Sequence, residues 1–85
     1  MGLTVMQINI QNFKKNKYLL SIEIAAQQPD IILVNELGVA TPTQLKLLGY
    51  RGTWINNVEY DGVAIYTKFN LKVEHVYFKL NDILV

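Results

Sequence analysis

The chain has 85 residues, of which 51% are hydrophobic and 18% are charged, and its formal net charge is +1. These values are typical of one small globular domain with a marginal core, and they give no global electrostatic attraction to nucleic acids. Because the sequence contains no cysteine, it cannot form a disulfide, a thiolate zinc site or a cysteine nucleophile.

The first predicted element is a strand over residues 3–10, because these residues are mostly β-branched or apolar and include neither glycine nor proline. Residues 11–16 are polar apart from Phe13 and include two asparagines, which is typical of a connection between elements. Asn16 is a favourable N-cap, so the sequence predicts a helix from about residue 17 to residue 28. Pro29 ends this helix, since the residue before a proline is disfavoured in the α region.

The apolar face of this helix is predicted from side chains that recur at helical spacing. Leu19, Ile22 and Ala26 form the stripe, and Tyr18 and Ala25 widen it. We expect this stripe to be the buried side of the helix.

A continuous apolar run, Ile-Ile-Leu-Val, occupies residues 31–34, directly after Asp30. A run without alternation is typical of a strand buried on both faces, in a parallel sheet that is covered by helices. Strand, helix and strand in this order predict a right-handed βαβ unit.

A second, shorter helix is predicted by its capping residues. Thr41 occupies the N-cap, Pro42 takes the first helical position, and Gln44 completes a capping box. Gly49 is expected to end this helix.

The chain after residue 49 has the pattern of an antiparallel meander. Strands are predicted over residues 50–55, 63–66 and 71–80, with turns at 56–57, 61–62, 68–70 and 81–82. The predicted fold class is therefore α/β, with a βαβ opening followed by an antiparallel meander in one mixed sheet. Residues 83–85 have the pattern of a strand that has only begun. We therefore expect residues 1–85 to be a single incomplete domain, the N-terminal part of a larger one.

Two polar side chains fall where the parallel strands of the βαβ unit end. Asn9 closes the first strand and Glu36 follows the second. Because ligands of open α/β sheets bind outside the carboxyl ends of the strands, these side chains are expected at one site. A carboxylate and an amide oxygen suit a hard cation such as Mg²⁺. The alternative is that both are ordinary polar residues at strand ends.

Three segments carry a family resemblance: residues 6–12 (Met-Gln-Ile-Asn-Ile-Gln-Asn), 28–36 (Gln-Pro-Asp-Ile-Ile-Leu-Val-Asn-Glu) and 61–66 (Asp-Gly-Val-Ala-Ile-Tyr). In order and spacing they resemble the endonuclease/exonuclease/phosphatase superfamily, and most of all the apurinic-like endonuclease domain of non-LTR retrotransposons, which accompanies a reverse transcriptase. The resemblance implies the first part of a four-layer α/β sandwich.

The resemblance also implies a site and a reaction. Glu36 would be the ligand of Mg²⁺, or of Mn²⁺ in its place, and Asn9 would orient the metal shell or the scissile phosphate. The reaction would be hydrolysis of a DNA phosphodiester. Asn35 stands where the family more often has glutamine. The family's later tyrosine, its Asp-x-Asn pair and its closing Ser-Asp-His segment have no counterpart here. We therefore expect an N-terminal fragment that is inactive alone, with DNA as the partner of the complete protein.

Three lysines adjoin the expected site. Lys14, Lys15 and Lys17 lie between the first strand and the predicted helix, where they would contact phosphates or form a solvated loop.

Aromatic residues and one histidine are further candidates. Trp54, Tyr60 and Tyr66 would either stack on bases or pack within the meander. His75 is the only histidine, and we expect a structural or surface role for it.

Two other functions compete with the nuclease. A dinucleotide-binding fold is disfavoured, because residues 10–16 contain no glycine that would let the backbone approach a pyrophosphate. The second alternative is a non-catalytic module that forms a homodimer, or pairs with a complementing chain, through its unfinished sheet. No apolar run approaches the roughly 20 residues that span a bilayer, and no signal-peptide pattern is present. An intracellular location, in the nucleus or cytoplasm, is therefore expected, without a membrane partner.

Overall fold

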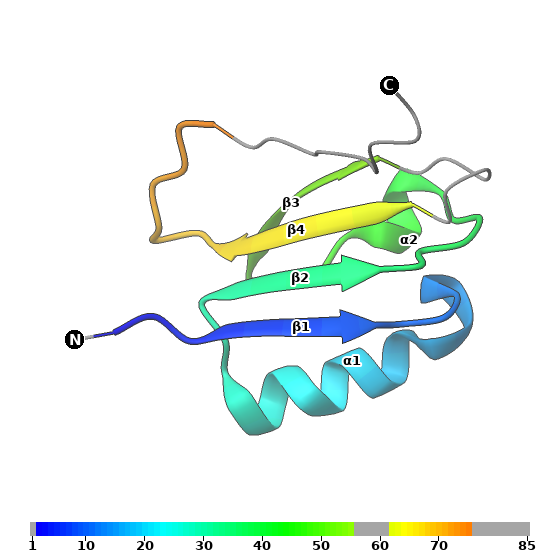
Figure 1. The fold of residues 1–85 in the computed structure, drawn as a ribbon, viewed down its shortest axis with the longest axis horizontal. Coiled ribbons are helices and arrows are strands. Elements are labelled where there is room, and N and C mark those ends of the chain that lie inside the picture. Colours follow the sequence, from blue (N-terminus) through cyan, green and yellow to red (C-terminus); the bar gives the residue numbers. More distant parts are fainter. Residues whose placement is uncertain (1, 56–61, 76–85) are drawn as a thin grey trace, which may run out of the picture.

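The computed structural model describes residues 2–55 and 62–75 of the chain. They form a four-stranded mixed sheet with both helices packed on one face (Figure 1). The elements are β1 (Val5–Asn9), α1 (Phe13–Gln27), β2 (Ile31–Asn35), α2 (Pro42–Leu45), β3 (Tyr50–Ile55) and β4 (Val63–Lys68). The strand order is β1-β2-β4-β3, with β1 parallel to β2 and the other pairs antiparallel. The predicted α/β class and its βαβ opening are confirmed.

The strand predicted over residues 71–80 is wrong for the part that the structure describes. The chain turns after β4, where the Leu71 amide donates to the Lys68 carbonyl over 3.0 Å, and residues 71–75 form no strand. The topology supplies the reason. β4 already pairs with β2 on one side and β3 on the other, so a chain that reverses after β4 has no neighbouring edge to join. The predicted turns at 56–57 and 81–82 and the predicted strand start at 83–85 lie outside the described residues.

Helix α1 begins four residues earlier than predicted. Its N-cap is Asn12, whose side-chain oxygen accepts a hydrogen bond from the Lys15 amide over 3.1 Å. Asn16 is not the cap, because it lies within the helix and its side chain bonds to the preceding loop. At the other end Gln28 adopts the left-handed conformation with φ 46° and lies outside the helix, as expected for a residue that precedes proline.

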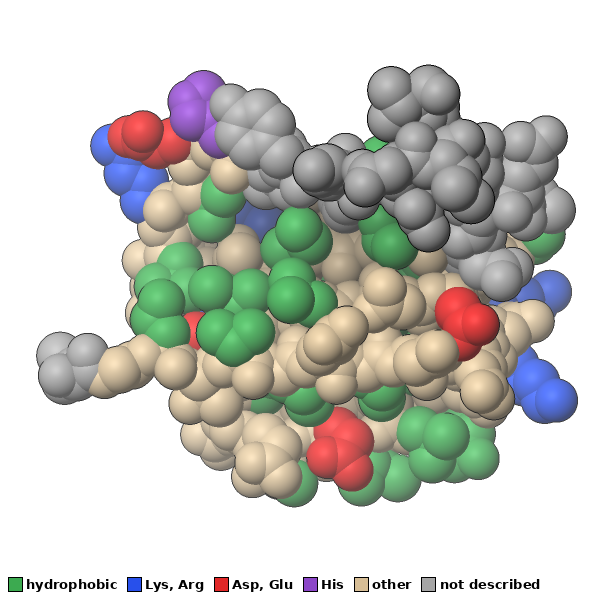
Figure 2. Space-filling view, viewed as in Figure 1, with side chains coloured by type: hydrophobic (Ala, Val, Ile, Leu, Met, Phe, Trp, Pro, Cys, Tyr) green, Lys and Arg blue, Asp and Glu red, His purple; other side chains and the backbone are tan. Residues whose placement is uncertain are grey.

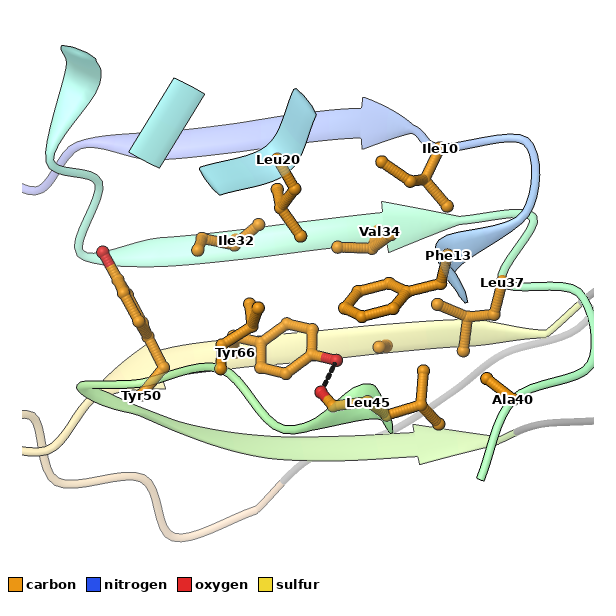
Figure 3. Close-up of a cluster of buried hydrophobic side chains, with 12 residues drawn as sticks. Ile10, Phe13, Leu20, Ile32, Val34, Leu37, Ala40, Leu45, Tyr50 and Tyr66 are labelled. Carbon is orange, nitrogen blue, oxygen red and sulfur yellow. Dashed lines mark hydrogen bonds between the residues drawn. The ribbon is translucent and has the colours of Figure 1, made fainter. Parts of the chain in front are cut away.

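The predicted buried face of α1 is also wrong. Phe13 and Leu20 are the buried residues of the helix, whereas Leu19 and Ile22 are 43% and 59% exposed and Ala26 is also exposed. Helix α1 carries apolar side chains on most of its circumference, so periodicity alone does not select the side that packs. The earlier start adds Phe13, whose fully buried ring lies in the core between the helix and the sheet (Figure 3).

Helix α2 has the predicted capping box. Thr41 accepts a hydrogen bond from the Gln44 amide, and the Gln44 side chain accepts one from the Thr41 amide. The helix ends at Leu45, before the predicted end at Gly49. Leu45 and Leu47 are both buried, and two residues separated by two positions face the same side of an extended chain but not of a helix.

The hydrophobic core lies between the sheet and the helices (Figure 3). Tyr66 is fully buried at its centre, where its ring packs against the rings of Phe13 and Trp54 at centroid distances of 6.2 and 6.4 Å. Its hydroxyl donates to the Leu45 carbonyl, and the Tyr50 hydroxyl donates to the Pro29 carbonyl. The core consists of Ile10, Phe13, Leu20, Ile32, Val34, Leu37, Ala40, Leu45, Leu47, Tyr50, Ala64 and Tyr66.

The face of the sheet opposite the helices carries a group of hydrophobic side chains (Figure 2). Along β2 the side chains alternate between buried and half-buried, so Ile32 and Val34 enter the core while Ile31 and Leu33 point to the other face. The strand predicted to be buried on both faces is thus fully buried on one only. Among the described residues, no helix is long and apolar enough to cross a membrane.

Candidate metal site at the carboxyl edge of the parallel strands

The parallel pairing of β1 and β2 brings their carboxyl ends to one edge of the sheet (Figure 1). Asn9 is in register with Asn35, and Glu36 follows directly. The two segments that the sequence predicts to form the site are therefore neighbours. Asn9 and Glu36 alone do not define a binding site. Whether they form one depends on the geometry of the loops that follow β1 and β2.

The loop after β1 is hydrogen-bonded to the loop after β2 along three successive steps. The Ile10 amide donates to the Asn35 carbonyl over 3.0 Å, and the Asn12 amide donates to the Glu36 carbonyl over 2.9 Å. The Phe13 amide then donates to the Leu37 carbonyl over 2.8 Å. These bonds extend the pairing of the strands into the loops and hold Glu36 against the start of α1.

A hollow of about 280 Å³ opens between these two loops. It is lined by Gln11, Asn12, Glu36 and Gly38. All four residues have positive φ, at 48°, 88°, 57° and 68° respectively. For a residue other than glycine this conformation costs on the order of 1–2 kcal/mol, and such residues cluster at functional sites. The hollow is thus built by backbone that is unfavourable in isolation.

The carboxylate of Glu36 is not fully satisfied within the chain. Its Oε2 atom is buried and has no hydrogen-bond partner among the described residues. A buried oxygen of an acidic side chain normally has a donor, because desolvating it without one is costly. Glu36, which lines the hollow, therefore keeps one carboxylate oxygen without a partner among the described residues.

Asp30 lies at the opposite end of β2 from Glu36, and its carboxylate has partners within the chain. It accepts a hydrogen bond from the Thr4 amide over 2.7 Å and lies 3.4 Å from the Lys68 ammonium. The Thr4 amide, together with Lys68, lowers the pKa of this carboxyl below its ordinary value. Asp30 is a partnered strand-entry residue, in contrast to Glu36.

Asn9 is at the predicted edge but does not line the hollow. It is exposed, and it lies on the same face of β1 as Gln7, whose side-chain amide donates to the Asn35 oxygen over 3.2 Å. Asn9 therefore lies beside Asn35, the residue before Glu36, on the face of the sheet away from the helices.

The three lysines belong to α1 and not to a loop, because the helix starts at Phe13. Lys14 and Lys15 are exposed in the first turn, which contains no acidic residue. Lys17 is half-buried and has a structural contact, since its ammonium donates to the Gln44 carbonyl over 2.9 Å and lies 5.8 Å from the Phe13 ring centroid. Of the three lysines, Lys14 and Lys15 are exposed, and neither lines the hollow.

The donors around the hollow fit a hard divalent cation with a largely hydrated shell. Glu36 supplies one carboxylate and Gln11 a side-chain amide oxygen. The Asn12 side-chain oxygen accepts from the Lys15 amide, and the main-chain carbonyls of Gln11 and Asn12 accept from Asn16, so these oxygens are already used within the chain. Mg²⁺ commonly takes one or two protein carboxylates and keeps several waters. Within residues 2–55 and 62–75 no group of three or more His, Cys, Asp or Glu side chains comes together, so a closed all-protein metal cage is not formed there.

The sequence predicts Asn9 and Glu36 for this edge, and of the two only Glu36 lines the hollow; it does not predict the lining residues Gln11, Asn12 and Gly38. The residue types favourable to positive φ among these are Gly38 and, more weakly, Asn12. Nothing in the sequence indicates a left-handed backbone at Gln11.

The remaining candidates lie away from this edge. Tyr66 is a core residue and Trp54 is half-buried against it, so of the two roles considered for these rings the structure shows packing. His75 is exposed beyond β4. Tyr60 and Asp61 lie outside the described residues.

No protein-family model matches this sequence, and no curated protein matches it.

Proposed function

We propose that this chain binds Mg²⁺, or Mn²⁺, at Glu36 and supplies the cation-binding edge of a phosphodiester hydrolase that acts on DNA. The observation that carries the proposal is the buried, unpartnered Oε2 of Glu36 beside a hollow at the carboxyl edge of two parallel strands. The resemblance of residues 6–12, 28–36 and 61–66 to the endonuclease/exonuclease/phosphatase superfamily supports the choice of reaction.

Each residue near the site would have one role in binding the cation or the phosphate. Glu36 holds the cation, and the Asn9 amide orients the phosphate or the hydration shell from the neighbouring strand. Lys14 and Lys15 add salt-sensitive contacts to the phosphate backbone. A bound Mg²⁺ supplies neutralisation of charge on the phosphate oxygens.

A general base is not assigned within the chain. The family's later tyrosine, Asp-x-Asn pair and Ser-Asp-His segment have no counterpart in the sequence, and His75 does not lie at the Glu36 edge. We therefore propose that the chain binds the cation but does not cleave DNA efficiently alone.

The first test is a Mn²⁺ titration followed by electron paramagnetic resonance, with Mg²⁺ as competitor. We expect one Mn²⁺ site per chain in the wild type. The Glu36→Gln variant should lose it, because it removes the charge and keeps the shape of the side chain. The matched control is Glu23→Gln, which removes an exposed glutamate from α1. Equal binding by wild type and Glu36→Gln would contradict the assignment.

A plasmid-nicking assay with Mg²⁺ addresses the reaction separately. Background-level nicking by a wild type that binds Mn²⁺ agrees with a chain that lacks a general base. Nicking that depends on Glu36 would show instead that the chain assembles a working site.

A second candidate function is a non-catalytic module that pairs through its sheet. The supporting observation is the group of hydrophobic side chains on the sheet face opposite the helices (Figure 2). Val5 is 55% exposed and alternates along β1 with Met6 and Ile8, which pack against the core, so its side chain is on that face. The interface expected at residues 83–85 lies outside the described residues. This candidate predicts a dimer in sedimentation equilibrium that Val5→Lys dissociates, whereas Leu48→Lys, at a fully exposed position outside the sheet, leaves it intact. A monomer at all concentrations would contradict it.

A further inference from the structure

Asn16 makes an unusual pair of contacts for a helical asparagine. Its side-chain Nδ2 donates to two successive carbonyls of the preceding loop, to Ile10 and to Gln11, each over 2.9 Å. An asparagine amide carries two N–H donors, so one group can satisfy both carbonyls at once. Asn16 is half-buried and does not line the hollow at Glu36.

These two carbonyls flank the point at which the chain enters the left-handed region. Gln11 and Asn12, with φ of 48° and 88°, turn the chain from β1 into α1 and form one wall of the hollow. The main-chain bonds from Ile10, Asn12 and Phe13 to the other loop use the amide groups of this segment. The carbonyls of Ile10 and Gln11 point away from the other loop. The Asn16 side chain is their hydrogen-bond donor.

The wall opposite is formed by Glu36 and Gly38, which also have positive φ. The width of the hollow, and therefore the distance from Glu36 to the wall formed by Gln11 and Asn12, depends on both walls staying in place. The wall at Glu36 is continuous with β2 at the centre of the sheet. The wall at Gln11 follows an edge strand, so it depends more on local side-chain bonds.

We propose that Asn16 is a positioning residue for the cation site: by donating to the Ile10 and Gln11 carbonyls it holds the loop that faces Glu36, and cation affinity depends on it without direct contact. This inference rests on the proposed function, because it presumes that Glu36 binds a cation. Partners that orient metal-site residues typically change affinity by about 10- to 100-fold when removed.

Three variants of the full 85-residue chain test the proposal by Mn²⁺ titration. Asn16→Ala removes both donors and should weaken Mn²⁺ binding by about 10- to 100-fold. Asn16→Asp keeps the shape, removes both donors and adds a negative charge. Charge alone would strengthen Mn²⁺ binding, whereas loss of the two hydrogen bonds weakens it, so we expect weaker binding. Asn16→Ser keeps one hydroxyl donor and should bind with intermediate affinity.

The control is Ser21→Ala, on the same helix. Ser21 donates to the Lys17 carbonyl over 3.1 Å, so this change also deletes a bond from a side chain to a main-chain carbonyl, away from the hollow. Its Mn²⁺ affinity should equal that of the wild type. Circular dichroism at the titration temperature shows which variants are folded. If Asn16→Ala is unfolded, Asn16→Ser is used in its place to test the role of Asn16.

The outcomes separate this inference from the function on which it rests. Wild-type affinity in the folded Asn16 variants, with loss in Glu36→Gln, would overturn the role of Asn16 and leave the cation site standing. Stronger binding by Asn16→Asp would also overturn it, since charge and not position would then control affinity. Absence of Mn²⁺ binding by the wild type would overturn both.

Discussion

The Tyr66→Ala variant should lose about 3–5 kcal/mol of the free energy of unfolding. Tyr66 is fully buried between the helices and the sheet, and its ring contacts those of Phe13 and Trp54. Its hydroxyl also satisfies the carbonyl at the end of α2. A chain of 85 residues has a total stability of roughly 4–13 kcal/mol, so this one change removes a large fraction of it.

Urea denaturation followed by circular dichroism measures this loss. Tyr18→Ala is the control, because Tyr18 is 62% exposed on α1 and should change the stability by less than about 0.5 kcal/mol. Tyr66→Phe separates the hydroxyl from the ring and should lose about 1–3 kcal/mol by leaving the Leu45 carbonyl unpaired. Equal effects of Tyr66→Ala and Tyr18→Ala would contradict this description of the core.

The second large effect is expected at Glu36, and its sign depends on the cation. Without divalent cations, Glu36→Gly should be more stable than the wild type by about 1 kcal/mol, because glycine tolerates φ of 57° and the unpartnered carboxylate is removed. With Mg²⁺ at 100 times its dissociation constant, the wild type should gain about 2.7 kcal/mol and the variant nothing. The order of the two stabilities therefore reverses.

Thermal unfolding with and without Mg²⁺ checks this reversal. Glu74→Gly is the control, since Glu74 is an exposed acidic residue outside the helices and strands. It should respond to Mg²⁺ as the wild type does. A Glu36→Gly variant that is less stable than the wild type in metal-free buffer would show that Glu36 has a structural role and would contradict its assignment as a strained site residue.

Local patterns in the sequence predict most of the elements. The Thr41 capping box, the proline after α1 and the apolar run of β2 each depend on residues close together in the chain, and each was found where expected. The start of α1 could not be predicted in this way. Asn12 and Asn16 are equally good caps by type, and only the folded loop shows that the side chain of Asn16 is used elsewhere.

The candidate site, too, can be predicted from the sequence only in part. The topology of a βαβ unit is sufficient to bring Asn9 and Glu36 to one edge. The hollow itself depends on left-handed backbone at Gln11 and Asn12, which long-range main-chain bonds to the other loop maintain. Such strain is imposed by tertiary contacts, so residue type does not reveal it.

The strand order also affects how the molecule folds. The β3–β4 pair closes between Ile55 and Val63, 8 positions apart (63 − 55), whereas each β1–β2 pair, such as Val5 and Ile31, is 26 positions apart (31 − 5). The longer loop adds about 1 kcal/mol of closure entropy, and distant contacts slow folding. We infer that the C-terminal hairpin forms early and the parallel edge forms late. The hollow at Glu36 exists only once that edge is complete, so a cation bound there, as proposed, would select only chains that have finished folding.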